Sequence, residues 1–177
     1  MKKTVIVVIL FLAFLLIYFL QANFFNWFTI AGVKPNLFVI LILFVGLFAG
    51  KNIGLTVGIS FGIILDLFIS RKIGVSGIML GLIGFGGGYL DKNFSKESKI
   101  TIMIMVMGST LVYETGSYII NTLIFSSNFE IIPFIIKLII ETLYNAILTI
   151  IFYPLFQKAG YYIEEKFKGN KILTRYY

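Results

Sequence analysis

The chain has 177 residues, of which 59% are hydrophobic and only 13% are charged, and its mean hydropathy is +0.98. This composition lies outside the range of soluble globular proteins and indicates an integral membrane protein. Six spans of about 20 residues each would use most of the chain, which excludes a separate soluble catalytic domain.

The chain contains no histidine and no cysteine. This removes the usual ligands of zinc, haem and iron–sulfur clusters, the commonest general base and all thiol chemistry, so we expect no metal and no cofactor. The net charge of +7 comes from basic residues scattered at the ends of apolar runs. Because they form no dense patch, they indicate orientation in a lipid bilayer and not binding of nucleic acid.

The first predicted helix follows the charged start of the chain, residues 1–4, and includes the apolar run from Val5 to Leu20. This beginning is typical of a signal peptide, but no small-x-small cleavage site follows it. The apolar character also continues to Ile30. We therefore predict an uncleaved transmembrane helix with aromatic residues at its far interface.

Five further apolar runs predict an all-α integral membrane protein with a bundle of six transmembrane helices. They cover residues 35–50, 52–70, 73–90, 100–125 and 131–157. Backbone groups in hydrocarbon must be paired within a helix or a closed barrel, and these runs lack the alternation of barrel strands. The expected transmembrane domain is therefore residues 1–157.

The distribution of Lys and Arg outside these runs predicts the orientation. Eleven lie on the side that holds the N-terminus and three on the opposite side, so both termini are expected in the cytoplasm of an inner-membrane protein. Residues 158–177 then form a basic, aromatic cytoplasmic tail. This tail either lies on the anionic inner leaflet or is a positive-inside end whose lysines snorkel to the interface.

Glycine is concentrated in the middle of the chain, with 12 of the 17 between Gly46 and Gly88. One row recurs every four residues and leads to Asp66, and a second follows one face of the fourth predicted helix. The candidate residues for helix packing or partner binding are Gly54, Gly58, Gly62, Asp66, Gly77, Gly81, Gly84 and Gly88. Such faces let membrane helices approach closely, inside one bundle or against another protein. The glycine cluster at 84–88 is also expected to loosen its helix.

Charged side chains at bilayer depth are costly and should face protein or water. The candidate contacts of Asp66 are Arg71, Lys72 or a polar group of a partner. Lys137 and Glu141 are four residues apart, which predicts a pair that neutralises itself. The candidate intramembrane polar site comprises Glu114, Asn121, Lys137, Glu141 and Asn145. Because these residues form stripes on the last two helices, the helices should face each other or line a common cavity.

The polar stripes leave three uses open: mutual structural pairing, a ligand or proton pathway, and binding of a partner. An enzyme would need a nucleophile, a base and an orienting group within reach of one another. No D-x-x-D or H-x-x-E pattern occurs in the chain, and no histidine is present to act as the base. The sequence therefore predicts a protein that is not an enzyme.

Four segments carry a resemblance to a known family. They are Gln21–Asn23, the Lys-Pro-Asn-Leu segment at 34–37, the glycine row that ends in Leu-Asp-Leu at 65–67, and Ile73-Gly74. Together they resemble the MreD family, small polytopic membrane proteins of bacterial rod-shape determination. Asn36 departs from the pattern, because the family more often carries an acidic residue after the proline.

The resemblance implies a non-enzymatic component of the cell-elongation machinery. The family acts with MreC, a single-span periplasmic protein, and with the MreB cytoskeleton. It is linked to the RodA glycosyltransferase and its penicillin-binding transpeptidase, and so to lateral peptidoglycan synthesis. We expect the glycine-lined helices and Asp66 to present a face to an MreC-like helix.

The resemblance also implies a fold similar to the six-helix substrate-binding subunits of energy-coupling-factor vitamin transporters. Because fold does not decide function, a vitamin-binding transport subunit is the alternative. Such a subunit needs a polar pocket near the outer face.

Overall fold

The computed structural model describes residues 2–69, 73–91, 94–125 and 130–168. Within these ranges the chain is helical, apart from turns and one isolated bridge between Ile30 and Val33, which confirms the all-α class. The elements are α1 (Lys2–Phe19), the π-helical turn η1 (Leu20–Phe24), α2 (Phe25–Trp27), α3 (Leu37–Ala49), α4 (Lys51–Ile69), α5 (Val75–Leu90), α6 (Lys99–Phe125) and α7 (Ile131–Lys168).

Four segments among the described residues are long and apolar enough to cross a membrane. They are Thr4–Trp27, which joins α1, η1 and α2, together with α4, α6 and α7. The helices α3, with 13 residues, and α5, with 16, are shorter than a span of about 20 residues. The six predicted apolar segments are thus present as helices, but four of them have spanning length.

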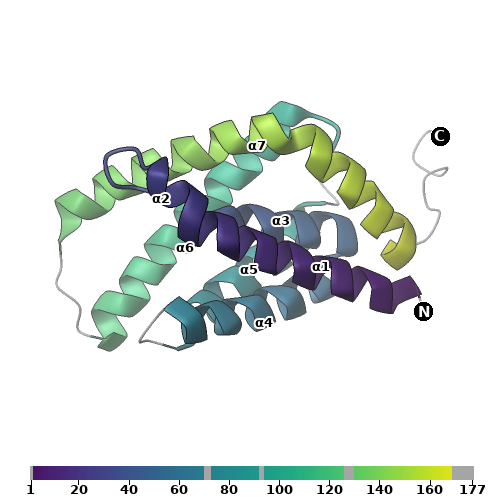
Figure 1. Ribbon diagram of the computed structural model, residues 1–177, viewed down its shortest axis with the longest axis horizontal. Coiled ribbons are helices and arrows are strands. Elements are labelled where there is room, and N and C mark those ends of the chain that lie inside the picture. Colours follow the sequence, from purple (N-terminus) through teal and green to yellow (C-terminus); the bar gives the residue numbers. More distant parts are fainter. Residues whose placement is uncertain (1, 70–72, 92–93, 126–129, 169–177) are drawn as a thin grey trace.

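The short helix α3 forms the centre of the bundle. All thirteen of its residues are buried, and it packs against α1, α4, α5, α6 and α7 (Figure 1). A helix that is hydrophobic on every side is stable when protein surrounds it in this way. At its C-terminus Gly50 has a φ of 98°, a conformation that glycine adopts without strain, and the chain turns directly into α4.

The helices α4 and α5 pack antiparallel, with their backbones in contact at the glycine rows. A Cβ atom on Gly58 would lie 2.7 Å from the carbonyl carbon of Leu80, and one on Gly62 would lie 2.5 Å from the Cα of Gly77. A Cβ on Gly84 would overlap the carbonyl group of Gly54. These contacts are shorter than real Cβ contacts, so the two rows bring the helices of this chain together.

The expectation of a loosened helix at residues 84–88 is wrong, because α5 is continuous from Val75 to Leu90. Gly84 and Gly88 approach the backbones of Gly54 and Lys51. This close packing offsets the low helix propensity of glycine.

The helix α7 has 38 residues and contains Pro154 in its interior, near a change of direction visible in Figure 1. It extends eleven residues beyond the expected boundary at 157, so the first part of the predicted tail is helical. The remainder of that tail, residues 169–177, lies outside the described residues. The N-terminal end of α1 and the C-terminal end of α7 lie at the same end of the bundle (Figure 1).

An ionic cluster attaches the second half of α7 to the turn before α6. The ammonium of Lys96, which is buried, lies 2.6 Å from Asp91 Oδ1 and 2.7 Å from Glu164 Oε1. The hydroxyl of Tyr153 donates to the carbonyls of Lys96 and Glu97, at 3.1 and 2.7 Å. These contacts hold the end of the bundle that contains the N-terminus.

Candidate functional site

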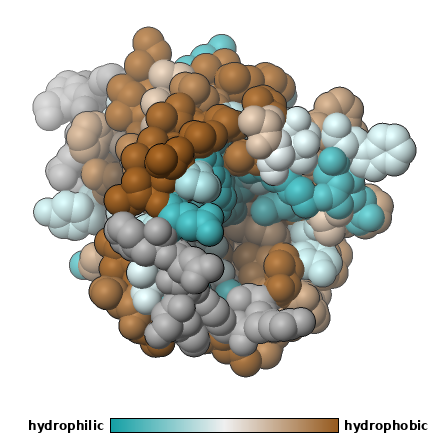
Figure 2. Space-filling model, turned by 90° about the vertical axis from the view of Figure 1, so that its left-hand side faces the viewer, coloured by the Kyte–Doolittle hydropathy of each residue, from teal (hydrophilic) through white to brown (hydrophobic). Residues whose placement is uncertain are grey.

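A polar cleft lies at the opposite end, where α6 ends and α7 begins. Figure 2 views this end, where hydrophilic surface leads into a hollow that hydrophobic surface partly surrounds. A cavity of about 360 Å³ there is lined by Glu114, Ser117, Tyr118, Asn121, Glu130, Pro133, Phe134 and Lys137. A second cavity of about 260 Å³ shares Glu114, Ser117, Asn121 and Lys137 with the first, so the two are neighbours.

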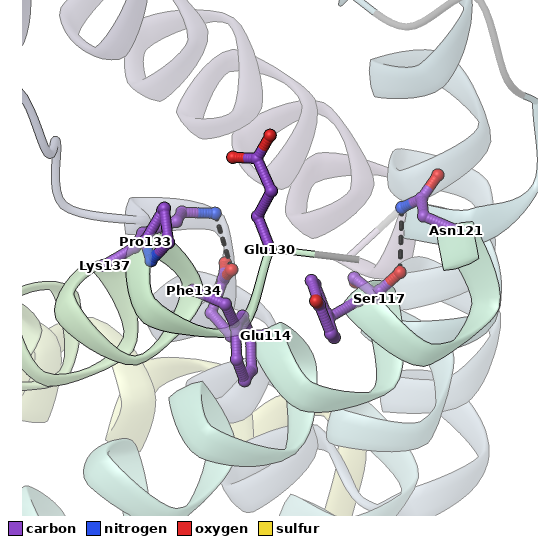
Figure 3. Close-up of a pocket in the computed structure, with 8 residues that line it drawn as sticks. Glu114, Ser117, Asn121, Glu130, Pro133, Phe134 and Lys137 are labelled. Carbon is purple, nitrogen blue, oxygen red and sulfur yellow. Dashed lines mark hydrogen bonds and ion pairs between the residues drawn. The ribbon is translucent and has the colours of Figure 1, made fainter. Parts of the chain in front are cut away.

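The centre of the cleft is an ion cluster between α6 and α7. The ammonium of Lys137 lies 2.5 Å from Glu114 Oε2 and 3.6 Å from Glu141 Oε2. The two glutamate side chains are 6% and 3% exposed, whereas that of Lys137 is 50% exposed. Figure 3 shows the lysine turned toward Glu114 across the gap between the helices. Two buried carboxylates therefore share one partly exposed ammonium.

The predicted pair of Lys137 and Glu141 is present, but it does not neutralise itself. The shorter contact of Lys137 is with Glu114, on the neighbouring helix. The four-residue spacing identified the contact within α7. The contact between helices depends on how α6 packs against α7. The spacing of residues along one helix carries no information about that packing.

Asn145 joins three helices beneath the cleft. It is fully buried, its Oδ1 accepts from the backbone N–H of Asn36 at 2.8 Å, and its Nδ2 donates to Thr110 Oγ1 at 3.0 Å. Asn121 instead donates to the carbonyl of Ser117 on its own helix, at 2.8 Å (Figure 3). The two predicted asparagines therefore differ, because Asn145 holds the bundle together and Asn121 lines both cavities.

Asp66 binds the start of α5. Its side chain is buried, and Oδ2 accepts from the backbone N–H groups of Gly74, at 2.8 Å, and Ser76, at 3.0 Å. A carboxylate there satisfies donors that a helix N-terminus leaves unpaired. Arg71 and Lys72, the contacts suggested by the sequence, lie outside the described residues.

Two polar atoms near the ion cluster are buried and have no hydrogen-bond partner among the described residues. They are Ser117 Oγ and Glu141 Oε1. The described residues also contain no group of three or more acidic, histidine or cysteine side chains placed to hold a metal ion. The cleft is thus rich in hydrogen-bond acceptors, with Lys137 supplying the cationic group among the described residues that line it.

The cleft and most of the helical bundle lie within the part of the chain that matches one protein-family model. A family model described as rod shape-determining protein MreD matches residues 1–160, which include every residue of the cleft. The chain belongs to the MreD family. No curated protein and no solved structure matches it. As an MreD protein it has a role in rod-shape determination, in a family that is part of the rod-shape machinery with MreC.

Three of the four segments that carry the MreD resemblance converge on the second cavity. Gln21, Asn36 and Asp66 all line it, although they are far apart along the sequence. The side chain of Gln21, in the π-helical turn, accepts from the backbone N–H of Leu37 at 3.3 Å, and Asn36 Oδ1 accepts from that of Val39 at 3.4 Å. Both therefore bind the start of α3. An acidic residue at position 36 would accept in the same way.

Sequence reasoning singled out neither of these roles in this MreD protein. The signal for Asn36 is present, because asparagine directly before an apolar run is a common helix N-cap. The role of Gln21 has no local signal, since its acceptor reaches a helix that begins sixteen residues later.

Proposed function

We propose that this chain is a non-enzymatic, multi-pass component of the cell-elongation machinery of the bacterial inner membrane, and that it binds the transmembrane helix of an MreC-like partner. Through that partner it is linked to RodA, to the penicillin-binding transpeptidase and to the MreB cytoskeleton, and so to lateral peptidoglycan synthesis. The observation that carries the proposal is the match of the MreD family model to residues 1–160.

Both termini are proposed to lie in the cytoplasm. The excess of Lys and Arg on that side supports this orientation, as does the common position of the start of α1 and the end of α7 (Figure 1). In this orientation the cleft between α6 and α7 opens on the periplasmic side. The two short helices α3 and α5 would complete a six-helix bundle with the four longer ones.

The partner's helix is proposed to bind a lipid-facing surface and not the paired glycine rows. Gly54, Gly58 and Gly84 are already in contact with neighbouring backbones of this chain, so they leave no room for another helix. At Gly86 on α5 and Gly108 on α6, by contrast, an added Cβ would meet no atom within 4 Å. Close packing drives helix association in lipid, so small residues with open space beside them are the favoured contacts.

Single-cysteine crosslinking tests this proposal, because the chain has no cysteine of its own. Gly86→Cys and Gly108→Cys would be introduced separately and oxidised in membranes that contain an MreC-like partner with one cysteine in its transmembrane helix. We expect a disulfide-linked heterodimer from at least one site. The control is Val39→Cys, a buried position in α3.

The outcome that would contradict the proposed surface is a set of crosslinks no stronger than those of the control.

The role in elongation is tested separately, in rod-shaped cells depleted of their own MreD protein. Expression of this chain should restore rod shape when its MreC-like partner is also supplied. Cells that remain round, although both proteins reach the membrane, would contradict the role.

A second candidate function is that of a vitamin-binding transport subunit. The cavity of about 360 Å³ favours it, because a solute-binding subunit needs a polar pocket of this kind and pockets for small molecules begin at about this volume. Purification together with an ATP-driven transport module and a bound vitamin would support this candidate. Purification with a single-span wall-synthesis partner would support the elongation role.

A further inference from the structure

The two carboxyl groups of the ion cluster lie against each other. Glu114 and Glu141 are within hydrogen-bonding reach of one another, and their side chains are 6% and 3% exposed. An ionised carboxylate only accepts hydrogen bonds, so two ionised carboxylates cannot bond to each other. A carboxyl group that carries a proton can donate to its neighbour. The contact between the two glutamates therefore requires one proton.

The ammonium of Lys137 decides which glutamate carries this proton. It lies 2.5 Å from Glu114 Oε2 but 3.6 Å from Glu141 Oε2, so Glu114 is the carboxylate that has a close counter-ion. Glu141 Oε1 is buried and has no hydrogen-bond partner among the described residues. A proton there turns an unpaired acceptor into a donor, and Glu114 is the acceptor within reach. The proton therefore belongs to Glu141 and the negative charge to Glu114.

The groups that face Glu141 from the neighbouring elements leave the proton in place. On α6, Tyr113 also faces Glu141, but its hydroxyl donates to Ser76 Oγ at 3.2 Å. Before α3, Asn36 contributes a neutral amide, and α3 itself is wholly apolar. On α4, Asp66 faces Tyr113, and its Oδ2 binds the start of α5. Within the described ranges these groups add no second cation to the cluster.

We infer that Glu114 and Glu141 form a binding site for a single proton, which exchanges with water through the cleft between α6 and α7. With the proton bound, the cluster has one ammonium, one carboxylate and one neutral carboxyl group, and so no net charge. Glu114 and Lys137 line both cavities, which gives the site its path to water. Loss of the proton leaves two buried carboxylates that repel each other across the two helices, at a depth where net charge is costly. The proton therefore couples the pH at the open end of the cleft to the packing of α6 against α7. The inference is independent of the proposed partner and of the surface that it binds.

Infrared spectroscopy of the full chain in lipid nanodiscs tests for the proton directly. A protonated carboxyl group absorbs at a higher frequency than a carboxylate, and its band shifts in deuterated water. We expect such a band at neutral pH. It should be lost in both Glu141→Gln and Glu114→Gln, because either change leaves one carboxylate paired with Lys137. Glu130→Gln, an exposed change in the same cleft, should leave the band unchanged. Absence of the band from the parent, or its loss in only one of the two pair variants, would overturn the inference.

The pH dependence of unfolding gives a second measurement on the same proteins. Glu141→Gln is expected to fold, because the amide donates to Glu114 in place of the carboxyl proton. An unfolded glutamate has released its proton at neutral pH, so unfolding of the parent should release one proton and stability should fall as the pH rises. Relative to Glu141→Gln, the equilibrium constant of unfolding of the parent should rise about tenfold per pH unit around neutrality. The same pH dependence in both proteins would overturn the inference.

Discussion

Replacing Gly84 by alanine is expected to separate α4 from α5. The new Cβ would lie 3.0 Å from the Cα of Gly54 and closer still to its carbonyl group, and backbone atoms cannot rotate out of the way as a side chain can. Gly86→Ala is the matched control on the same helix, because its Cβ would meet nothing within 4 Å. Both changes gain about 1 kcal/mol in helix propensity, so the difference between them measures the cost of overpacking.

Overpacking typically costs about 1–3 kcal/mol, and a contact between backbones belongs at the upper end of that range. A difference of about 3 kcal/mol corresponds to roughly 6–12 °C in Tm for a chain of this size. We would measure thermal unfolding of both variants and of the parent in the same detergent. Equal melting temperatures for Gly84→Ala and Gly86→Ala would refute the account of glycine packing within the chain.

Three further changes test the polar contacts. Lys137→Met should destabilise the protein by about 2–3 kcal/mol, which is less than for a fully buried pair because the lysine is half exposed. Adding Glu114→Gln to this variant should restore more stability than adding Glu141→Gln. If Glu141→Gln restored more, the assigned contacts would be contradicted. Asp66→Ala should cost about 1–2 kcal/mol because the cap of α5 is lost. Asp66→Asn should cost less, because an acceptor oxygen remains. Equal melting temperatures for these two variants would argue against capping. Lys96→Met should free the second half of α7, seen as faster hydrogen exchange of residues 155–168, and unchanged exchange would show that the ionic cluster is dispensable.

The helices were predictable because apolar runs must pair their backbones internally, whatever their neighbours are. The fact that α3 is too short to span a membrane was not predictable in this way. Its thirteen residues are apolar on every side, which fits a lipid-facing span as well as a helix enclosed by protein. The five helices that surround α3 show that it is enclosed by protein. Hydropathy along the chain contains no information about these neighbours.

The candidate site was predictable in its composition but not in its connections. The stripes on the last two helices identified Glu114 and Lys137, yet their contact joins residues 23 apart on different helices. Asp66 lay at the end of the glycine row, and its buried contacts with the start of α5 depend on the close approach of α4 that the row permits. In both cases the sequence pattern identified the residues on one helix face, whereas their partners on the neighbouring helix depend on how the helices pack.

The most direct test of the proposed function is to purify the chain from native membranes in a mild detergent and identify by mass spectrometry the proteins and small molecules recovered with it. The account predicts a single-span MreC-like protein together with wall-synthesis enzymes. Recovery of an ATP-driven transport module with a bound vitamin, and no single-span partner, would contradict it.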